Sequence, residues 1–212
     1  ARERVAIVDY SMLGKISVEG SGAEAFLQRV CTNNMAMACG RIAYTLLLNE
    51  RGGIESDVTV ARYANDRYMV MSSIARTRRD YLWLASLIEP DEQVRLRDET
   101  ASLGVLGVMG PQSRALMAAV TELDVSNEAF PFNRFYDCHI GHAKVTAQRL
   151  SYSGELGWEI MVTPDFAEHV LDSLLSAGGP LGVKLLGSEA LNALRIEKGF
   201  LHWGHDMAYT ES

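Results

Sequence analysis

Residues 152–160 read Tyr-Ser-Gly-Glu-Leu-Gly-Trp-Glu-Ile, and this stretch decides how the second half of the chain folds. Its serine and two glycines are typical of a turn, and the residues that follow predict a strand over 157–162. Just upstream, residues 135–140 and 144–152 alternate in polarity around Gly141, a pattern that predicts a hairpin. The stretch therefore joins a hairpin to a further strand.

The rest of the chain shows the same mixture of strands and capped helices. Residues 57–63 and 67–72 alternate around a polar turn and predict a second hairpin. Ser21 and Glu24 form a capping-box pattern, which predicts a helix over residues 22–30. Further strands are expected over 5–8, 15–18, 44–48, 94–97 and 105–109, and further helices over 76–88, 111–120, 164–178 and 188–199. Strand clusters interrupted by helices, without regular βαβ alternation, indicate an α+β fold.

Length and composition limit the classes of protein. A chain of 212 residues with 48% hydrophobic and 22% charged residues can form one large domain or two intimate lobes. We expect a single functional domain over 1–212, with lobes formed by residues 1–54 plus 126–212 and by residues 55–125. The net charge of -7 argues against a nucleic-acid or anionic-membrane partner.

Three cysteines do not make a disulfide framework in a chain of this length, and an odd count fits a reducing compartment. No apolar run approaches the ~18 residues of a membrane span, and no signal-peptide pattern opens the chain. We expect a soluble protein of the cytoplasm, or of the mitochondrial matrix in a eukaryote. The chain begins with Ala-Arg-Glu-Arg instead of methionine, so we expect a piece of a longer protein.

Two familiar kinds of site are not supported by the residue spacing. Gly104, Gly107 and Gly110 have the wrong spacing for a dinucleotide-binding fingerprint, and we interpret them as turn and close-packing glycines. Cys138 and His139 are adjacent on an expected strand, so their side chains point to opposite faces and cannot share one metal ion. No metal site is predicted.

The roles of two further groups of residues each have two interpretations. His202 and His205 follow a helix end, where imidazole commonly complements exposed carbonyls, but either could serve as a general base. Arg76, Arg78 and Arg79 form either a solvated helix face or a subsite for the anionic tail of a ligand.

Three segments combine turn glycines with lone carboxylates or aromatic residues. The first is residues 49–60, Asn-Glu-Arg-Gly-Gly-Ile-Glu-Ser-Asp-Val-Thr-Val, and the second is the opening stretch, 152–160. The third is residues 194–206, Leu-Arg-Ile-Glu-Lys-Gly-Phe-Leu-His-Trp-Gly-His-Asp. In this order they resemble the folate-binding half of the aminomethyltransferase family, the T-protein of glycine cleavage. Residues 9–15 and the Gly-Pro pair at 110–111 are similar to two further landmarks of that family.

The resemblance covers essentially the whole chain and implies intertwined lobes with mixed and antiparallel sheets around tetrahydrofolate. It places the aspartate matching Asp57 near the folate nitrogens that receive the one-carbon unit. The glutamate matching Glu159 holds the pterin. The expected site is therefore catalytic Asp57 with cofactor-binding Tyr44, Tyr152, Glu159 and Arg195, where the partner of Arg195 is either folate or a structural carboxylate such as Glu197.

The chemistry of a pterin agrees with these assignments. Its ring N–H and adjacent amino group match the two oxygens of one carboxylate, and such bidentate charge-assisted contacts are selective. Tyrosine or tryptophan can stack on the flat ring. An ionised Asp57 stabilises a cationic iminium and takes up the proton that the folate nitrogen sheds. We therefore expect Asp57 and Glu159 to converge on one reduced pteridine.

The sequence departs from the stand-alone T-protein in ways that indicate a branch of the family. Residues 203–206 read Trp-Gly-His-Asp where T-proteins usually carry Tyr-Gly-x-Glu, and a single Asp57 stands where they tend to have paired aspartates. Both departures are similar to the folate domains fused to flavin-dependent dimethylglycine and sarcosine dehydrogenases. The resemblance thus implies an enzyme that forms 5,10-methylenetetrahydrofolate from an iminium derived from a methylated glycine, with FAD only in a fused or partner oxidoreductase domain.

Three other functions are consistent with the sequence. A stand-alone aminomethyltransferase would act on an aminomethyl-lipoyl carrier protein. A folate-dependent demethylase would use another methyl donor. A non-enzymatic folate-binding maturation factor is also related, but it carries a cysteine after Lys-Gly where this chain has Phe200.

Overall fold

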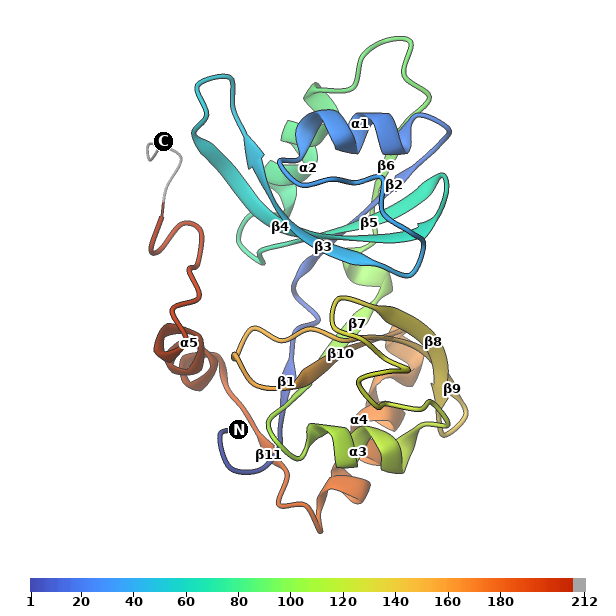
Figure 1. Cartoon of the computed structure of the whole chain (residues 1–212), viewed down its shortest axis with the longest axis vertical. Coiled ribbons are helices and arrows are strands. Elements are labelled where there is room, and N and C mark those ends of the chain that lie inside the picture. The colour runs from blue at the N-terminus through green and yellow to red at the C-terminus, as the bar shows by residue number, and fades with distance from the viewer. Residues whose placement is uncertain (208–212) are drawn as a thin grey trace. The chain divides into compact units, whose positions relative to one another are not determined.

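The computed structural model describes residues 1–207. These residues belong to two compact units (Figure 1). The first unit comprises Ala1–Met12 and Ser102–Phe200, and the second comprises Leu13–Ala101 and the segment that begins at Leu201. Each unit is thus assembled from two separate stretches of chain. This interleaving, with a mixed sheet in one unit and an antiparallel sheet in the other, confirms the expected α+β class.

The expected lobe boundaries need correction. A division after residue 54 would separate β3 (Ile42–Leu48) from β4 (Ile54–Ala64), although these strands pair along the whole of β3. A division after residue 125 would separate β7 (Gly104–Met109) from β10 (Gly157–Val162), which pair residue by residue. Hydrogen bonds between strands distant in sequence determine the boundaries of the two units. Local sequence pattern does not predict which strands pair.

The first unit is built on a six-stranded sheet with two helices packed on one face. Trp158 and Ile160 of β10 point toward those helices and pack with Leu116 and Leu174. Because successive side chains of a strand alternate between faces, Glu159 points to the opposite face. The strand order is β11 (Lys184–Leu185), β1 (Ala6–Asp9), β7, β10, β9 (Ala143–Gln148) and β8 (Phe135–Ile140); the helices are α3 (Ser113–Val120) and α4 (Pro164–Gly178), followed by α5 (Ser188–Glu197).

The second unit is a five-stranded antiparallel sheet with two helices against one face (Figure 1). Phe26 and Leu84 of these helices pack on Val58 and Val60 of β4. Asp57 therefore points to the other face of this sheet. The strand order is β3, β4, β5 (Arg67–Ser72), β2 (Gly14–Glu19) and β6 (Arg95–Asp98); the helices are α1 (Ala23–Val30) and α2 (Thr77–Ser86), and a short 3-10 helix covers Thr100–Ser102.

Most strands and helices lie within two or three residues of the ranges that periodicity predicts. The capping box at Ser21 is wrong: α1 is preceded by Gly22, and no side chain caps it. Instead the backbone N–H of Gly22 donates to the carbonyl of Gln93 at 3.1 Å. Strand β11 was not predicted because two residues carry no periodic signal. Within residues 1–207, no helix has the length and apolar character needed to span a membrane.

Candidate functional site

Asp57 lies on β4, on the sheet face opposite α1 and α2, and Tyr44 of β3 lies beside it. The Tyr44 hydroxyl donates to Oδ2 of Asp57 at 3.2 Å. Burial raises the pKa of Asp57, while the hydrogen bond from Tyr44 and the nearby His202 oppose the shift. A half-buried carboxylate with a raised pKa accepts a proton more readily than an exposed one.

The loop before Asp57 owes its shape to Asn49. The side-chain oxygen of Asn49 accepts from the backbone N–H groups of Arg51 at 3.0 Å and of Gly53 at 2.9 Å. Gly52 adopts a φ of +81°, which favours glycine. The side-chain nitrogen of Asn49 donates to Glu55 at 2.9 Å. The Asn-x-x-Gly-Gly pattern therefore acts as a turn that starts β4 in a defined position.

Behind Asp57, on the helix side of the sheet, lies a buried carboxylate that sequence reasoning missed. Asp80 of α2 is 1% exposed and accepts hydrogen bonds from the hydroxyls of Ser56, at 2.8 Å, and Ser72. Burial raises the pKa of Asp80, and the two hydroxyls oppose this shift. Because Ser56 precedes Asp57, Asp80 anchors β4 at the candidate catalytic residue. Only its pairing with two buried serines reveals this role.

Trp203 holds the C-terminal segment of the second unit against β4. Its indole N–H donates to the carbonyl of Ile54 at 2.9 Å, and the guanidinium carbon of Arg76 lies 3.3 Å from the ring centroid. Arg79 hydrogen-bonds the Glu55 carbonyl at 2.7 Å and pairs with its carboxylate. Arg76 and Arg79 are therefore not simply a solvated face. A cavity of about 220 Å³ here is lined by Ser73, Ala75, Arg76, His202, Trp203, Gly204 and His205.

In the first unit, Glu159 occupies the centre of β10 and is 5% exposed. Its carboxylate makes no hydrogen bond or ion pair with another side chain within residues 1–207. Burial raises the pKa of Glu159 to about 8. Tyr10 lies close enough for its pKa to be raised further by Glu159 and by Tyr152, so these three residues share one neighbourhood.

Tyr152 and Arg195 lie on the same unit as Glu159. The Tyr152 ring stacks on Phe200, with centroids 6.1 Å apart and planes inclined by 21°. Arg195 is 4% exposed; its Nε donates to the Asn192 side chain at 2.8 Å, and one terminal nitrogen donates to the Phe200 carbonyl at 2.9 Å. Arg195 thus fastens the end of α5 to the residue on which Tyr152 stacks.

Glu197, considered as a structural partner of Arg195, is bound by Arg2. The Arg2 guanidinium donates to Glu197 at 2.8 Å and to Glu155 at 2.7 Å. It also donates to the carbonyls of Ser153 and Leu194, each at 2.8 Å. Arg2 therefore ties the N-terminus to the 152–160 stretch and to α5. Nothing in the sequence marks this pairing, because the partners are about 150 and 195 residues away.

Cys138 and His139 occupy opposite faces of β8, as the strand pattern predicts. Cys138 is buried in the core of the first unit, whereas His139 lies 3.6 Å from Glu122 on the exposed side. His142 stacks on His169 with centroids 3.8 Å apart. Within residues 1–207, no three His, Cys, Asp or Glu side chains are grouped as metal ligands.

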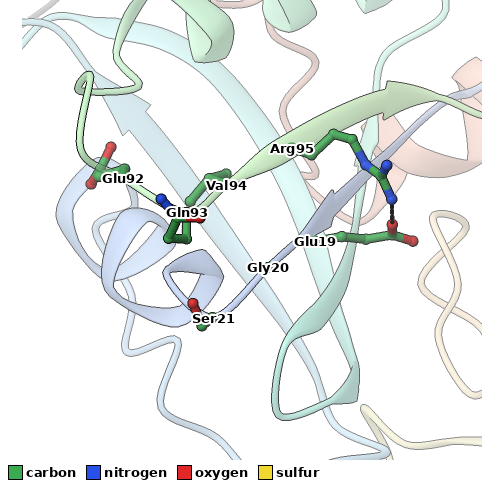
Figure 2. Close-up of a pocket in the computed structure, with 7 residues that line it drawn as sticks. All are labelled: Glu19, Gly20, Ser21, Glu92, Gln93, Val94 and Arg95. Atoms are coloured by element: carbon green, nitrogen blue, oxygen red, sulfur yellow. Dashed lines mark hydrogen bonds and ion pairs between the residues drawn. The ribbon is translucent and has the colours of Figure 1, made fainter.

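An open hollow of about 380 Å³ lies beside β6, and none of the predicted site residues lines it (Figure 2). Figure 2 shows Arg95 directed at Glu19, and their charged groups are 3.1 Å apart. Gly20 lies so close to the backbone at Gln93 that a Cβ on Gly20 would lie 2.0 Å from the Gln93 carbonyl oxygen. The hollow is thus formed by a tight backbone crossing.

The expected site residues fall into two groups, Asp57 with Tyr44 and Glu159 with Tyr152 and Arg195. The family described as "GCVT N-terminal domain" matches residues 1–212, and the chain belongs to that family. The aminomethyltransferase T of the glycine cleavage system from Bartonella henselae has the same fold, with a TM-score of 0.84 and 25% identity over 98% of this chain and 54% of that one.

Curated relatives with different names match nearly the whole chain. It is 37% identical to 4-methylaminobutanoate oxidase (formaldehyde-forming) of Paenarthrobacter nicotinovorans, over 98% of this chain and 25% of that protein. It is 32% identical to the aminomethyltransferase of Chloroherpeton thalassium, over 97% of this chain and 56% of that protein. Human sarcosine dehydrogenase is 32% identical over the whole chain and 24% of its own length. The chain therefore spans between about a quarter and just over half of these relatives.

Proposed function

We propose that this chain binds tetrahydrofolate and catalyses formation of 5,10-methylenetetrahydrofolate from an iminium derived from a methylated glycine. The observation that carries this proposal is the Glu159 carboxylate, buried in the first unit without an ionic partner among the described residues. A buried carboxylate without a partner costs free energy, and a ligand that supplies two adjacent N–H groups removes that cost.

The residues present fit a reduced pterin. Glu159 offers two acceptor oxygens, and Tyr152, partly exposed and stacked on Phe200, offers an aromatic face. Arg195 holds Phe200 in place through its carbonyl. In this proposal Glu159 orients the pterin edge, and Tyr152 lies against its plane. Tetrahydrofolate, when bound, supplies the nucleophilic nitrogen that accepts the one-carbon unit.

Asp57 is the proposed catalytic residue. In its ionised form it would stabilise the positive charge of an incoming iminium, and its oxygen would receive the proton shed when a folate nitrogen bonds the iminium carbon. It would return that proton to the amine, which leaves as the second folate nitrogen closes the methylene bridge and sheds its own proton to the departing amine. The Tyr44 hydroxyl, 3.2 Å from Oδ2, holds the carboxylate in one orientation and favours its ionised form. Asp80 supports this arrangement from the other side of the sheet through Ser56.

The choice of donor rests on two observations. Several relatives are named for oxidation of N-methylated amines, among them the formaldehyde-forming oxidase and sarcosine dehydrogenase. Residues 203–206 read Trp-Gly-His-Asp, a departure from the usual T-protein pattern that is similar to the folate domains fused to dimethylglycine and sarcosine dehydrogenases. A flavin oxidoreductase domain outside this chain would generate the iminium.

The second candidate is aminomethyl transfer from a lipoyl carrier protein. It is favoured by the relatives named aminomethyltransferase and by the structural match to a glycine-cleavage enzyme. The two candidates differ only in the donor, so Glu159 and Asp57 keep the same roles in both.

The test uses the protein that carries this chain, titrated calorimetrically with tetrahydrofolate and then assayed for 5,10-methylenetetrahydrofolate with each donor. We expect binding, product from N-methylated glycine oxidation, and none from an aminomethyl-lipoyl protein. Asp57→Asn should abolish transfer while keeping folate affinity within about tenfold, because the lost charge acts mainly in the transition state. Glu159→Gln should weaken binding by roughly 1.5–3 kcal/mol. Product from the lipoyl donor alone would select the second candidate, and absence of folate binding would reject both.

A further inference from the structure

Two further buried polar groups lie beside Glu159. The Tyr10 hydroxyl and the Gln148 side-chain oxygen are both buried and have no hydrogen-bond partner within residues 1–207. Tyr10 is 6% exposed and Gln148 is 1% exposed. An unpaired buried polar group costs roughly 1–3 kcal/mol of stability. The Tyr10 hydroxyl and the Gln148 oxygen therefore both destabilise the folded chain when no ligand is bound.

Strand register explains why these groups lie together. Gln148 of β9 is directly opposite Glu159 of β10, so both side chains project from the same face of the sheet. On the other side of β10, Gly107 of β7 is directly opposite Glu159. A Cβ on Gly107 would lie 2.6 Å from a ring carbon of Tyr10, so the Tyr10 ring occupies the place of the missing side chain. Tyr10, Glu159 and Gln148 therefore form a row.

The row has a defined pattern of hydrogen-bonding capacity. The side-chain nitrogen of Gln148 donates to the sulfur of Met161 at 2.9 Å, which leaves the amide oxygen as an acceptor. Burial raises the pKa of Tyr10, so its hydroxyl keeps its proton and can donate. From Tyr10 to Gln148 the row thus presents one donor, two carboxylate oxygens and one further acceptor.

This pattern matches one edge of a 2-amino-4-oxopteridine, which presents in order a carbonyl, a ring N–H and an amino group with two hydrogens. We propose that Tyr10 donates to the ring carbonyl and that Gln148 accepts the second amino hydrogen, on either side of the bidentate contact with Glu159. Tyr10 and Gln148 are thereby specificity-determining residues for the pterin. This inference rests on the proposed folate-binding function and adds two residues to it.

The first measurement is calorimetric titration of the full chain with tetrahydrofolate, for Tyr10→Phe and Gln148→Met. Each variant should bind roughly three- to tenfold more weakly, the value of one neutral hydrogen bond. Tyr136→Phe removes the same hydroxyl from an exposed position of the same unit and serves as the matched control; its affinity should equal that of the wild type.

The second measurement separates recognition from structural support. Tyr10→Phe removes an unpaired buried hydroxyl, so the melting temperature of the ligand-free variant should be equal to or higher than that of the wild type. A 2-desamino analogue of tetrahydrofolate lacks the group that Gln148 recognises. The Gln148→Met substitution should therefore have no effect on the affinity for this analogue.

Each outcome decides the inference. If the wild type binds tetrahydrofolate and both variants bind it equally well, the inference is wrong and the proposed function stands. If Tyr10→Phe lowers the melting temperature of the ligand-free protein, or if Gln148→Met weakens binding of the desamino analogue equally, the residues support the fold only. A wild type that binds no tetrahydrofolate rejects the inference together with the proposed function.

Discussion

The hydroxyl of Tyr44 donates to Oδ2 of Asp57 at 3.2 Å, across two neighbouring antiparallel strands. Burial raises the pKa of Asp57 and this hydrogen bond lowers it, so Tyr44 favours the ionised form of the carboxylate. An ionised carboxylate is the form that can stabilise a cation or accept a proton.

Tyr44→Phe removes the interaction that opposes the burial of Asp57, so the pKa of Asp57 should rise further. Because activity requires the ionised form, the acidic limb of the pH profile of kcat/KM should move to higher pH. Activity well above that limb should fall by less than about tenfold, since the charge itself is kept. An unchanged acidic limb in Tyr44→Phe would show that Asp57 does not control the profile.

Glu159 should make stability depend on pH. The folded-state pKa of about 8 lies above the ordinary value for glutamate, so the unfolded chain loses this proton first as pH rises. The protonated Glu159 carboxyl therefore contributes to the free energy of unfolding below about pH 4.5. This contribution is lost between about pH 4.5 and pH 8. Glu159→Gln should gain stability over the wild type across this range, roughly 4 kcal/mol by pH 8, measured by urea unfolding. Glu128→Gln, at an exposed position, is the control.

Ligand binding should release a proton from Glu159. The free carboxyl is mostly protonated at pH 7 because burial raises its pKa to about 8. Two N–H donors from a bound pterin favour the charged form and lower that pKa. Titrations at pH 7 in buffers of different ionisation enthalpy should show release of nearly one proton, and none in Glu159→Gln. Proton uptake on binding would contradict the assigned contact.

Asp80→Ala should destabilise the second unit and disturb Asp57. It removes the shared acceptor of the buried Ser56 and Ser72 hydroxyls, at an expected cost of about 2–4 kcal/mol. Because Ser56 is next to Asp57, one-carbon transfer should also fall in protein that remains folded. Unfolding by urea and the transfer rate below the transition are the measurements. Asp91→Ala, an exposed position, should change neither.

Arg2→Ala should loosen the first unit at two distant places together. Arg2 contacts Glu155 and Ser153 in the 152–160 stretch, and Glu197 and Leu194 in α5. Amide hydrogen exchange should accelerate in both segments, with a loss of about 1–2 kcal/mol because the pair is partly exposed. Arg4→Ala, exposed and close in sequence, should leave both segments unchanged. Faster exchange in only one segment would mean that Arg2 does not join them.

Local pattern predicted much of the secondary structure because its causes act over a few residues. Alternation predicted β4 and β5, and Gly141, with a φ of +58°, lies at the hairpin turn that its glycine character indicated. The capping box at Ser21 failed because Gly22 instead bonds Gln93, a partner 71 positions away. Long-range backbone pairing overrides a local capping preference.

The sequence by itself determined the family, the α+β class, and Asp57 and Glu159 as candidate residues, because short motifs and periodicity are properties of neighbouring positions. Only the tertiary structure decided that Tyr10 and Gln148 flank Glu159 and that Asp80 supports Asp57. Their proximity depends on which strands pair and in what register. A shift of register by one residue would turn Gln148 to the other face of its sheet and break up the row.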